Sequence, residues 1–202
     1  MVVLQSSVEF LRGAGIRKQG KARRYLRIKR EVRVDNQESW ARLVPGQDLR
    51  ITCLIDFDHP LISTTPYIFD FSEESFCADI APARTFGFMR DVKALRAHGL
   101  ALGGSLDNAI VIDGDVILNR EGLRFVDEFA RHKVLDAIGD LSLVGMPVIG
   151  HLELHRSGHA LNTRLVKELL DDPDSYEIVE PVLEAPSRAP RPRAFESVEG
   201  TL

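Results

Sequence analysis

Cysteine is scarce in this sequence: the 202 residues include only Cys53 and Cys77, which stand far apart and form no Cys-x-x-Cys pair. This scarcity excludes a disulfide framework and a cysteine-based zinc site, and it is typical of proteins from reducing compartments. Long hydrophobic runs are also absent, and the N-terminus lacks the basic segment and apolar run of a signal peptide. We therefore expect no membrane span and a cytoplasmic location.

The chain also has little excess charge of either sign. Its formal net charge is −4, which argues against a dedicated nucleic-acid binder. Two local basic runs, Arg17–Arg24 and Arg188–Arg193, are interpreted as solvated surface, with a phosphate-bearing partner as the alternative. A composition of 44% hydrophobic and 28% charged residues is typical of globular proteins, and 202 residues are enough for one substantial domain, or for one domain plus extensions.

Alternation of apolar and charged residues predicts strands in the first half of the chain. The stretch Arg24–Val34 places four apolar residues on one parity, as expected for a half-buried strand: Leu26, Ile28, Val32 and Val34. Short turns separate this stretch from two further predicted strands, at Trp40–Val44 and Leu49–Ile55. Three consecutive strands joined by short turns favour an antiparallel meander.

Caps, turns and periodicity predict the remaining elements. Further strands are expected at Tyr67–Phe71, Ala109–Ile112, Val116–Leu118 and Pro147–Leu154. Helices are expected at Val8–Ala14, Ser72–Ile80, Asp91–His98, Glu121–Ile138 with Asn119 as its cap, and Asn162–Leu170. Strands dominate the first half and helices the second, which predicts an α+β fold, a two-layer sandwich of an antiparallel sheet and helices. The Pro- and Arg-rich tail, 181–202, is expected to be disordered.

The helix expected over Glu121–Ile138 has two distinct faces. A continuous apolar stripe forms its core face: Val126, Ala130, Val134, Ala137 and Leu141. The second face combines two aromatic residues with three ionisable ones: Phe125, Phe129, His132, Asp136 and Asp140. His132 and Asp136 could be a surface pair, but the neighbouring phenylalanines favour a half-buried pair that is charged, paired or metal-bound. Imidazole and carboxylate are zinc ligands, although a catalytic zinc usually has three protein ligands and a water.

His159 is the next candidate, because it follows Ser157-Gly158 on a tight connection between a strand and a helix. It is either a loop histidine without a role, or a general acid or electrostatic group oriented by a carboxylate such as Asp140. The other four histidines are assigned to turns, a helix end and a solvated strand face: His59, His98, His151 and His155.

Six phrases lead to a more specific hypothesis: RIKREVRV (27–34), IDFDHP (55–60), RTFGFMRD (84–91), GLALGGSLDNAIV (99–111), GLRFVDEFARHKVLDAIGDL (122–141) and HRSGHALN (155–162). With these phrases in order, the sequence over about Val8–Val179 resembles the zinc-dependent UDP-3-O-acyl-N-acetylglucosamine deacetylases of lipid A biosynthesis. The resemblance implies two α+β domains with the active site between them, and this chain matches the second domain with its small βαβ-like insert. It also implies that a zinc-bound water attacks the acetamide carbonyl of the substrate, UDP-3-O-acyl-N-acetylglucosamine, and releases acetate and a free amine.

The resemblance implies catalytic roles for five residues. His132 and Asp136 would be ligands of Zn²⁺. His159, supported by Asp140, would stabilise the oxyanion or protonate the leaving amine. Thr85 would donate its hydroxyl proton to the oxyanion.

The resemblance also implies substrate contacts. Phe57 would stack on the uracil, and Lys133 and Arg156 would meet the diphosphate. Phe86 is a further expected substrate-binding residue. The passage for the acyl chain would be lined by residues between 88 and 111, among them Phe88, Met89, Val92, Gly104, Ser105 and Ala109.

The sequence departs from the family pattern in one respect. The family has a third zinc ligand, a histidine, directly after the glutamate that acts as general base, and this chain contains no Glu-His dipeptide. We therefore expect residues 1–20 to be the remnant of a preceding domain and linker, and residues 21–180 to be the C-terminal domain of a truncated form, with little or no activity alone. A separately encoded N-terminal domain would then be its partner. The alternative is a non-catalytic remnant or binding module that keeps the nucleotide and acyl surfaces.

Overall fold

The computed structural model describes residues 4–17, 19–57, 59–62, 64–99 and 102–180, so the tail expected to be disordered lies outside the described residues. Within them, the large sheet has seven strands: β1 (Tyr25–Ile28), β2 (Val32–Asn36), β3 (Ser39–Val44), β4 (Leu49–Leu54), β5 (Tyr67–Asp70), β9 (Val148–His155) and β10 (Tyr176–Val179). A smaller sheet contains β6 (Thr85–Phe88), β7 (Ala109–Asp113) and β8 (Val116–Ile117). The α-helices are α1 (Leu4–Ala14), α2 (Glu73–Ser75), α3 (Met89–Ala97), α4 (Glu128–Leu141) and α5 (His159–Asp171).

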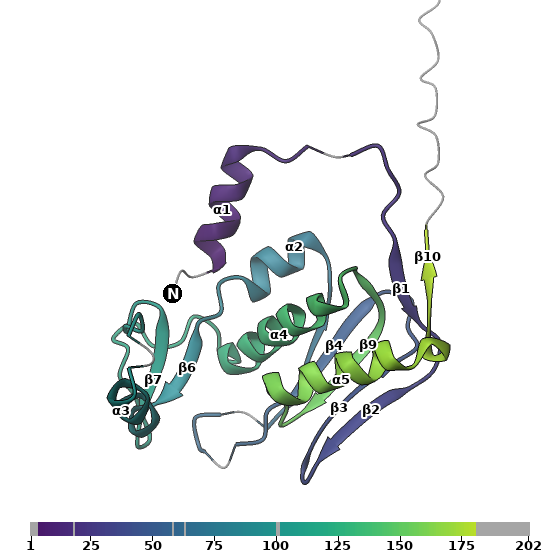
Figure 1. The fold of residues 1–202 in the computed structure, drawn as a ribbon. Coiled ribbons are helices and arrows are strands. Elements are labelled where there is room, and N and C mark those ends of the chain that lie inside the picture. The colour runs from purple at the N-terminus through teal and green to yellow at the C-terminus, as the bar shows by residue number, and fades with distance from the viewer. Residues whose placement is uncertain (1–3, 18, 58, 63, 100–101, 181–202) are drawn as a thin grey trace, which may run out of the picture.

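The molecule has the expected two layers, with α4 and α5 side by side across one face of the large sheet (Figure 1). The inward residues of the first two strands are buried as their parity predicts: Leu26, Ile28, Val32 and Val34. They face the buried stripes of the two helices, which include Val134, Ala137, Leu165 and Leu169. Burial of these apolar surfaces is the main force that holds the layers together. The predicted α+β class is therefore confirmed.

The βαβ-like insert is also confirmed. β6 and β7 pair in parallel, from Thr85 opposite Ala109 to Phe88 opposite Ile112, and α3 forms the connection between them. The turn after β7 has Gly114 in the left-handed region (φ 55°), as the Asp-Gly hairpin signal predicts. β6 itself lies in a segment for which the sequence pattern indicates no regular structure.

The stretch Arg24–Val34 forms two strands rather than the single one expected. The break falls at Lys29 and Arg30, whose backbone amides both donate to the carbonyl of Ser175, just before β10. β1 then pairs with β9 and β10, whereas β2 pairs with β3. Alternation predicts the buried face correctly, but it does not predict this break, which depends on a distant segment.

The meander expected for the first three strands is wrong at its third strand, and the sheet is mixed rather than purely antiparallel. β9 lies between β3 and β4, antiparallel to β3 and parallel to β4. The connection from β3 to β4 crosses β9 where Gly46 meets Gly150. A Cβ atom on Gly46 would lie 3.0 Å from the carbonyl carbon of Gly150, and one on Gly150 would lie 2.7 Å from Ile28 Cγ1. Gly46 is therefore needed where the connection crosses β9, and Gly150 where β9 packs against Ile28.

The helix expected from about Glu121 begins only at Glu128, so two sequence predictions are corrected. Val126 is 90% exposed rather than part of the core stripe. Asn119 caps no helix. Instead its buried side-chain amide accepts from the backbone of Val111 and donates to the carbonyls of Leu106 and Ala109. Further along the segment, Arg84 donates to the side chain of Glu121 and to the carbonyl of Gly122, and Arg124 donates to the carbonyl of Pro82. These tertiary contacts outweigh local helix propensity.

None of the helices described combines the length and the apolar character needed to cross a lipid bilayer.

Candidate active site

His132 and Asp136 lie one turn apart on α4 and face the same side of the helix. The Nε2 atom of His132 is 3.3 Å from Oδ1 of Asp136, and the two side chains are only 15% and 13% exposed. The i, i+4 spacing thus brings the imidazole and the carboxylate together in a half-buried pair, as the sequence predicts. Their role as metal ligands stays a prediction.

The surroundings of His132 favour the neutral imidazole. Burial lowers the pKa of His132, and the charges of Lys133 and His159 lower it further, against the opposing effects of Asp136 and the Ala83 backbone. Within the described chain, the Nδ1 atom of His132 is buried without a hydrogen-bond partner of normal geometry. Metal ions bind one nitrogen of a neutral histidine. Because Nε2 is the nitrogen beside Asp136, the buried Nδ1 is left to carry the proton.

The pair fits zinc. Zn–N and Zn–O bonds are about 2.0–2.2 Å long, so two ligands at a tetrahedral angle lie about 3.3 Å apart. The distance between His132 Nε2 and Asp136 Oδ1 has this value. The described residues contain no cluster of three or more His, Cys, Asp or Glu side chains arranged to hold a metal. The two residues can therefore supply part of a catalytic zinc site but not the whole of it.

His159 is the first residue of α5, and its imidazole is bonded to the carboxylate of Asp140 at the end of α4. Nδ1 lies 3.0 and 2.9 Å from the two carboxylate oxygens, and Nε2 lies 3.9 Å from Oδ1 of Asp136. The bond to Asp140 places the proton on Nδ1 and directs Nε2 toward the His132–Asp136 pair. His159 is 68% exposed, so the imidazole remains open to a ligand.

Asp140 has a second partner that sequence reasoning missed. The side-chain amide of Asn162 donates to Asp140 Oδ2 at 2.9 Å, and its carbonyl oxygen accepts from the hydroxyl of Ser157. Asn162 is 6% exposed. The signal available in the sequence is the position of Asn162 three residues after His159 on the same helix, where the two side chains share one face. The network from Ser157 to His159 fixes the orientation of the imidazole.

Thr85 is the first residue of β6, and the residues on either side of it contact α4. Before it, Arg84 is joined to Glu128 at the start of α4. After it, the ring of Phe86 packs against Phe129 at 4.9 Å between centroids and against His132 at 6.2 Å. Phe129 is a core residue, 2% exposed, rather than a member of the face that carries the candidate ligands.

The three residues expected at the nucleotide end line one pocket of about 410 Å³: Phe57, Lys133 and Arg156. Arg156 has a positive φ of 50° and donates from Nε to the carbonyl of Asp56 at 2.7 Å. It also pairs with the carboxylate of Glu38, which lines the same pocket and which sequence reasoning did not identify. Lys133 donates to Asp136 Oδ2 at 3.1 Å, so the pocket lies next to the candidate ligands.

The residues expected to line the acyl passage lie on the insert, on β6, α3, β7 and the connection between α3 and β7: Phe88, Met89, Val92, Gly104, Ser105 and Ala109. Phe88 and Phe86 both pack against Phe57, at 6.5 and 6.1 Å between ring centroids. The nucleotide pocket and the insert are therefore adjacent.

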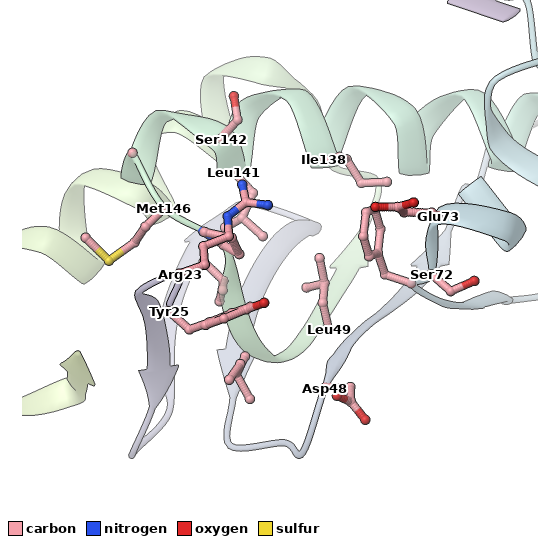
Figure 2. A pocket seen from close by; sticks show the side chains of 15 residues that line it. Arg23, Tyr25, Asp48, Leu49, Ser72, Glu73, Ile138, Leu141, Ser142 and Met146 are labelled. Carbon is pink, nitrogen blue, oxygen red and sulfur yellow. The ribbon is translucent and has the colours of Figure 1, made fainter. Parts of the chain in front are cut away.

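A second pocket, of about 780 Å³, contains none of the predicted site residues. It lies at the C-terminal end of α4, with Leu49 and Leu141 in its wall and with Arg23 and Glu73 on opposite sides (Figure 2).

Comparison with known proteins agrees with the resemblance. The family model described as LpxC, UDP-3-O-acyl N-acetylglycosamine deacetylase, matches residues 5–171. A UDP-3-O-acyl-N-acetylglucosamine deacetylase of Myxococcus xanthus is 51% identical over 169 residues, 84% of this chain and 54% of the relative. Deacetylases of the same name from Hahella chejuensis and Alcanivorax borkumensis are 50% and 49% identical, over 85% and 92% of this chain and 58% and 62% of the relatives.

The chain thus spans between half and two thirds of the length of these curated relatives. The identity is near 50% over most of the chain, and the family match includes both the large sheet and its helices. The chain is therefore homologous to these deacetylases. The chain belongs to the UDP-3-O-acyl N-acetylglycosamine deacetylase family.

Proposed function

We propose that this chain supplies part of a zinc-dependent deacetylase site that removes the N-acetyl group of UDP-3-O-acyl-N-acetylglucosamine in lipid A biosynthesis. The observation that carries the proposal is the half-buried pair of His132 and Asp136, which stand at the spacing of two zinc ligands. The names of the relatives support the substrate assignment. We place the reaction in the cytoplasm, in keeping with two free cysteines.

Zn²⁺ held by His132 and Asp136 would supply Lewis-acid polarisation of the acetamide carbonyl and a more acidic water. His159 acts beside that pair. Its Nδ1 proton is held by Asp140, so a second proton on Nε2 can stabilise negative charge on the carbonyl oxygen or pass to the leaving amine. Thr85 would donate its hydroxyl proton to the same oxygen.

The pocket beside Lys133 suits the nucleotide. Phe57 is 39% exposed and offers an aromatic surface on which the uracil can stack. Lys133 and Arg156 provide positive charge for the diphosphate, as cations do at phosphate sites. The acyl chain would then run along the insert from Phe86, over its apolar and small residues. This order places the acetamide near His132.

A second function, binding without hydrolysis, is favoured by the missing Glu-His dipeptide. Two protein ligands hold zinc weakly, and among the described residues we assign no carboxylate as the general base for its water. We propose that the 202 residues bind the substrate and that hydrolysis requires a glutamate and a histidine from outside them. This account calls for an N-terminal domain as partner, whether it is continuous with these residues or encoded separately.

Calorimetric titration with UDP tests the nucleotide site. We expect the wild-type chain to bind UDP and Lys133→Ala to bind it about tenfold more weakly, the usual cost of losing a charge-assisted hydrogen bond. The control is Lys167→Ala, which removes an exposed lysine paired with Asp171 on α5. Equal affinity in all three proteins would contradict the assignment.

Deacetylase assays separate the two functions. We expect no turnover by the chain alone. Turnover that appears on mixing with the N-terminal domain of the Myxococcus xanthus relative supports the partial active site. Continued UDP binding without turnover in that mixture supports the binding module instead.

A further inference from the structure

Both ring nitrogens of His59 make hydrogen bonds, and one of these bonds reaches beyond its own turn. The backbone amide of Leu61 donates to Nδ1 at 3.3 Å, and Nε2 lies 2.9 Å from the carbonyl oxygen of Gly114. Because Nδ1 accepts, the proton must be on Nε2, and the ring donates it to Gly114. The side chain is only 13% exposed. The imidazole thus joins two segments that are 55 residues apart in the sequence.

The two segments belong to opposite ends of the proposed substrate site. His59 follows Phe57, whose carbonyl oxygen accepts from the His59 amide at 2.8 Å. Gly114 forms the turn of the β7–β8 hairpin in the insert. The His59 ring also packs against Phe88 on β6, at 5.3 Å between centroids. One side chain therefore contacts the loop of the nucleotide pocket, the β7–β8 turn and strand β6 of the proposed acyl-binding insert.

We propose that His59 is a positioning residue that holds the insert against the Phe57 loop and so couples the nucleotide end of the site to the acyl end. This inference rests on the proposed function, since it assigns UDP and an acyl chain to the two ends. His59 itself touches neither ligand. The bond to Gly114 keeps the ring of Phe57 in contact with Phe86 and Phe88, so occupation of one end stabilises the other.

Two variants separate this role from a local turn. In His59→Asn, the side-chain oxygen can still accept from the amide two residues on, but the side chain is too short to reach Gly114. His59→Phe keeps the ring beside Phe88 and loses both hydrogen bonds. The control is His98→Asn, since the exposed His98 directly follows α3 and its bond among the described residues is to the carbonyl of Ala94, four residues earlier.

Hydrogen exchange of the full chain is the first measurement. We expect amides of residues 110–118 to exchange about fivefold faster in both His59 variants, the effect of losing one ordinary hydrogen bond, and to be unchanged in the control. Unchanged exchange of the hairpin in both His59 variants would overturn the proposal, whether or not UDP binds.

Ligand coupling is the second measurement, with UDP and decanoate as probes. In the wild-type chain, saturating decanoate should lower the Kd of UDP about fivefold, within the usual range of coupling between sites. In His59→Asn, the ratio of the Kd without decanoate to the Kd with decanoate should fall to near one. Retention of the full ratio in His59→Asn would overturn the coupling while leaving the proposed function intact. Absence of UDP binding in the wild-type chain would instead refute the proposed function and the coupling together.

Discussion

Arg84 and Glu128 form an ion pair in which both side chains are completely buried, with Arg84 Nε 2.9 Å from Glu128 Oε1. The backbone amide of Arg84 donates to the same oxygen at 3.0 Å. Arg84 precedes Thr85 at the start of β6, and Glu128 is the first residue of α4, one turn before His132. The pair therefore joins the insert to the helix that carries the candidate zinc ligands.

Removal of the Arg84 side chain should be strongly destabilising, because the buried Glu128 carboxylate then loses its compensating charge and keeps the backbone amides of Arg84 and Arg124 as partners. We expect Arg84→Met to lower the free energy of unfolding by about 3–5 kcal/mol. The control is Arg27→Met, which removes a pair with Glu177 whose side chains are 48% and 46% exposed and should cost less than about 1 kcal/mol. Urea unfolding followed by circular dichroism measures both values. Similar costs in the two variants would show that the buried pair contributes no more than a surface pair.

The same pair predicts a pH dependence. Burial opposes ionisation of Glu128, but hydrogen bonds from Arg84 and from the Arg124 amide outweigh it and hold the pKa of Glu128 below its ordinary value of 4.5. A lowered pKa in the folded state means that the stabilisation is complete above pH 4.5 and is lost as the pH falls through the folded pKa. In urea titrations, the difference between the wild-type chain and Glu128→Gln should therefore be constant above pH 5 and shrink below pH 4.5. A difference in stability between the two proteins that grows below pH 4.5 would contradict this prediction.

His159 should contribute to rate and not to zinc binding. In a preparation reconstituted with an N-terminal domain, we expect His159→Ala to lose about 10²–10⁴-fold in kcat, the usual contribution of a general acid or base, and to retain its zinc. Elemental analysis after gel filtration measures the metal, and release of acetate measures the rate. Loss of zinc from this variant would mean that His159 is a ligand instead.

Local patterns predict those features that depend on neighbours in sequence. Alternation places Leu26 and Val34 on the buried face whatever strands pair beside them. Ser72 caps the helix that follows it through a bond from the amide of Ser75. Helical spacing likewise brings His132 to Asp136 without knowledge of the rest of the chain.

Features that depend on distant segments escape such patterns. The insertion of β9 between β3 and β4 is a pairing across about a hundred residues, and no local signal specifies it. The start of α4 depends on the contact of Glu128 with Arg84. In the site, the two hydrogen bonds of His59 and the support of Asp140 by Asn162 arise only when separate elements come together.

The central claim is that His132 and Asp136 bind zinc. The most direct test follows the imidazole NMR signals of the six histidines during addition of Zn²⁺ to the chain and to Asp136→Asn. The account predicts that the His132 signals respond to zinc in the wild-type chain, that this response is lost in Asp136→Asn, and that His98 responds in neither protein. His132 signals unmoved at saturating zinc, or an identical response without the Asp136 carboxylate, would contradict it.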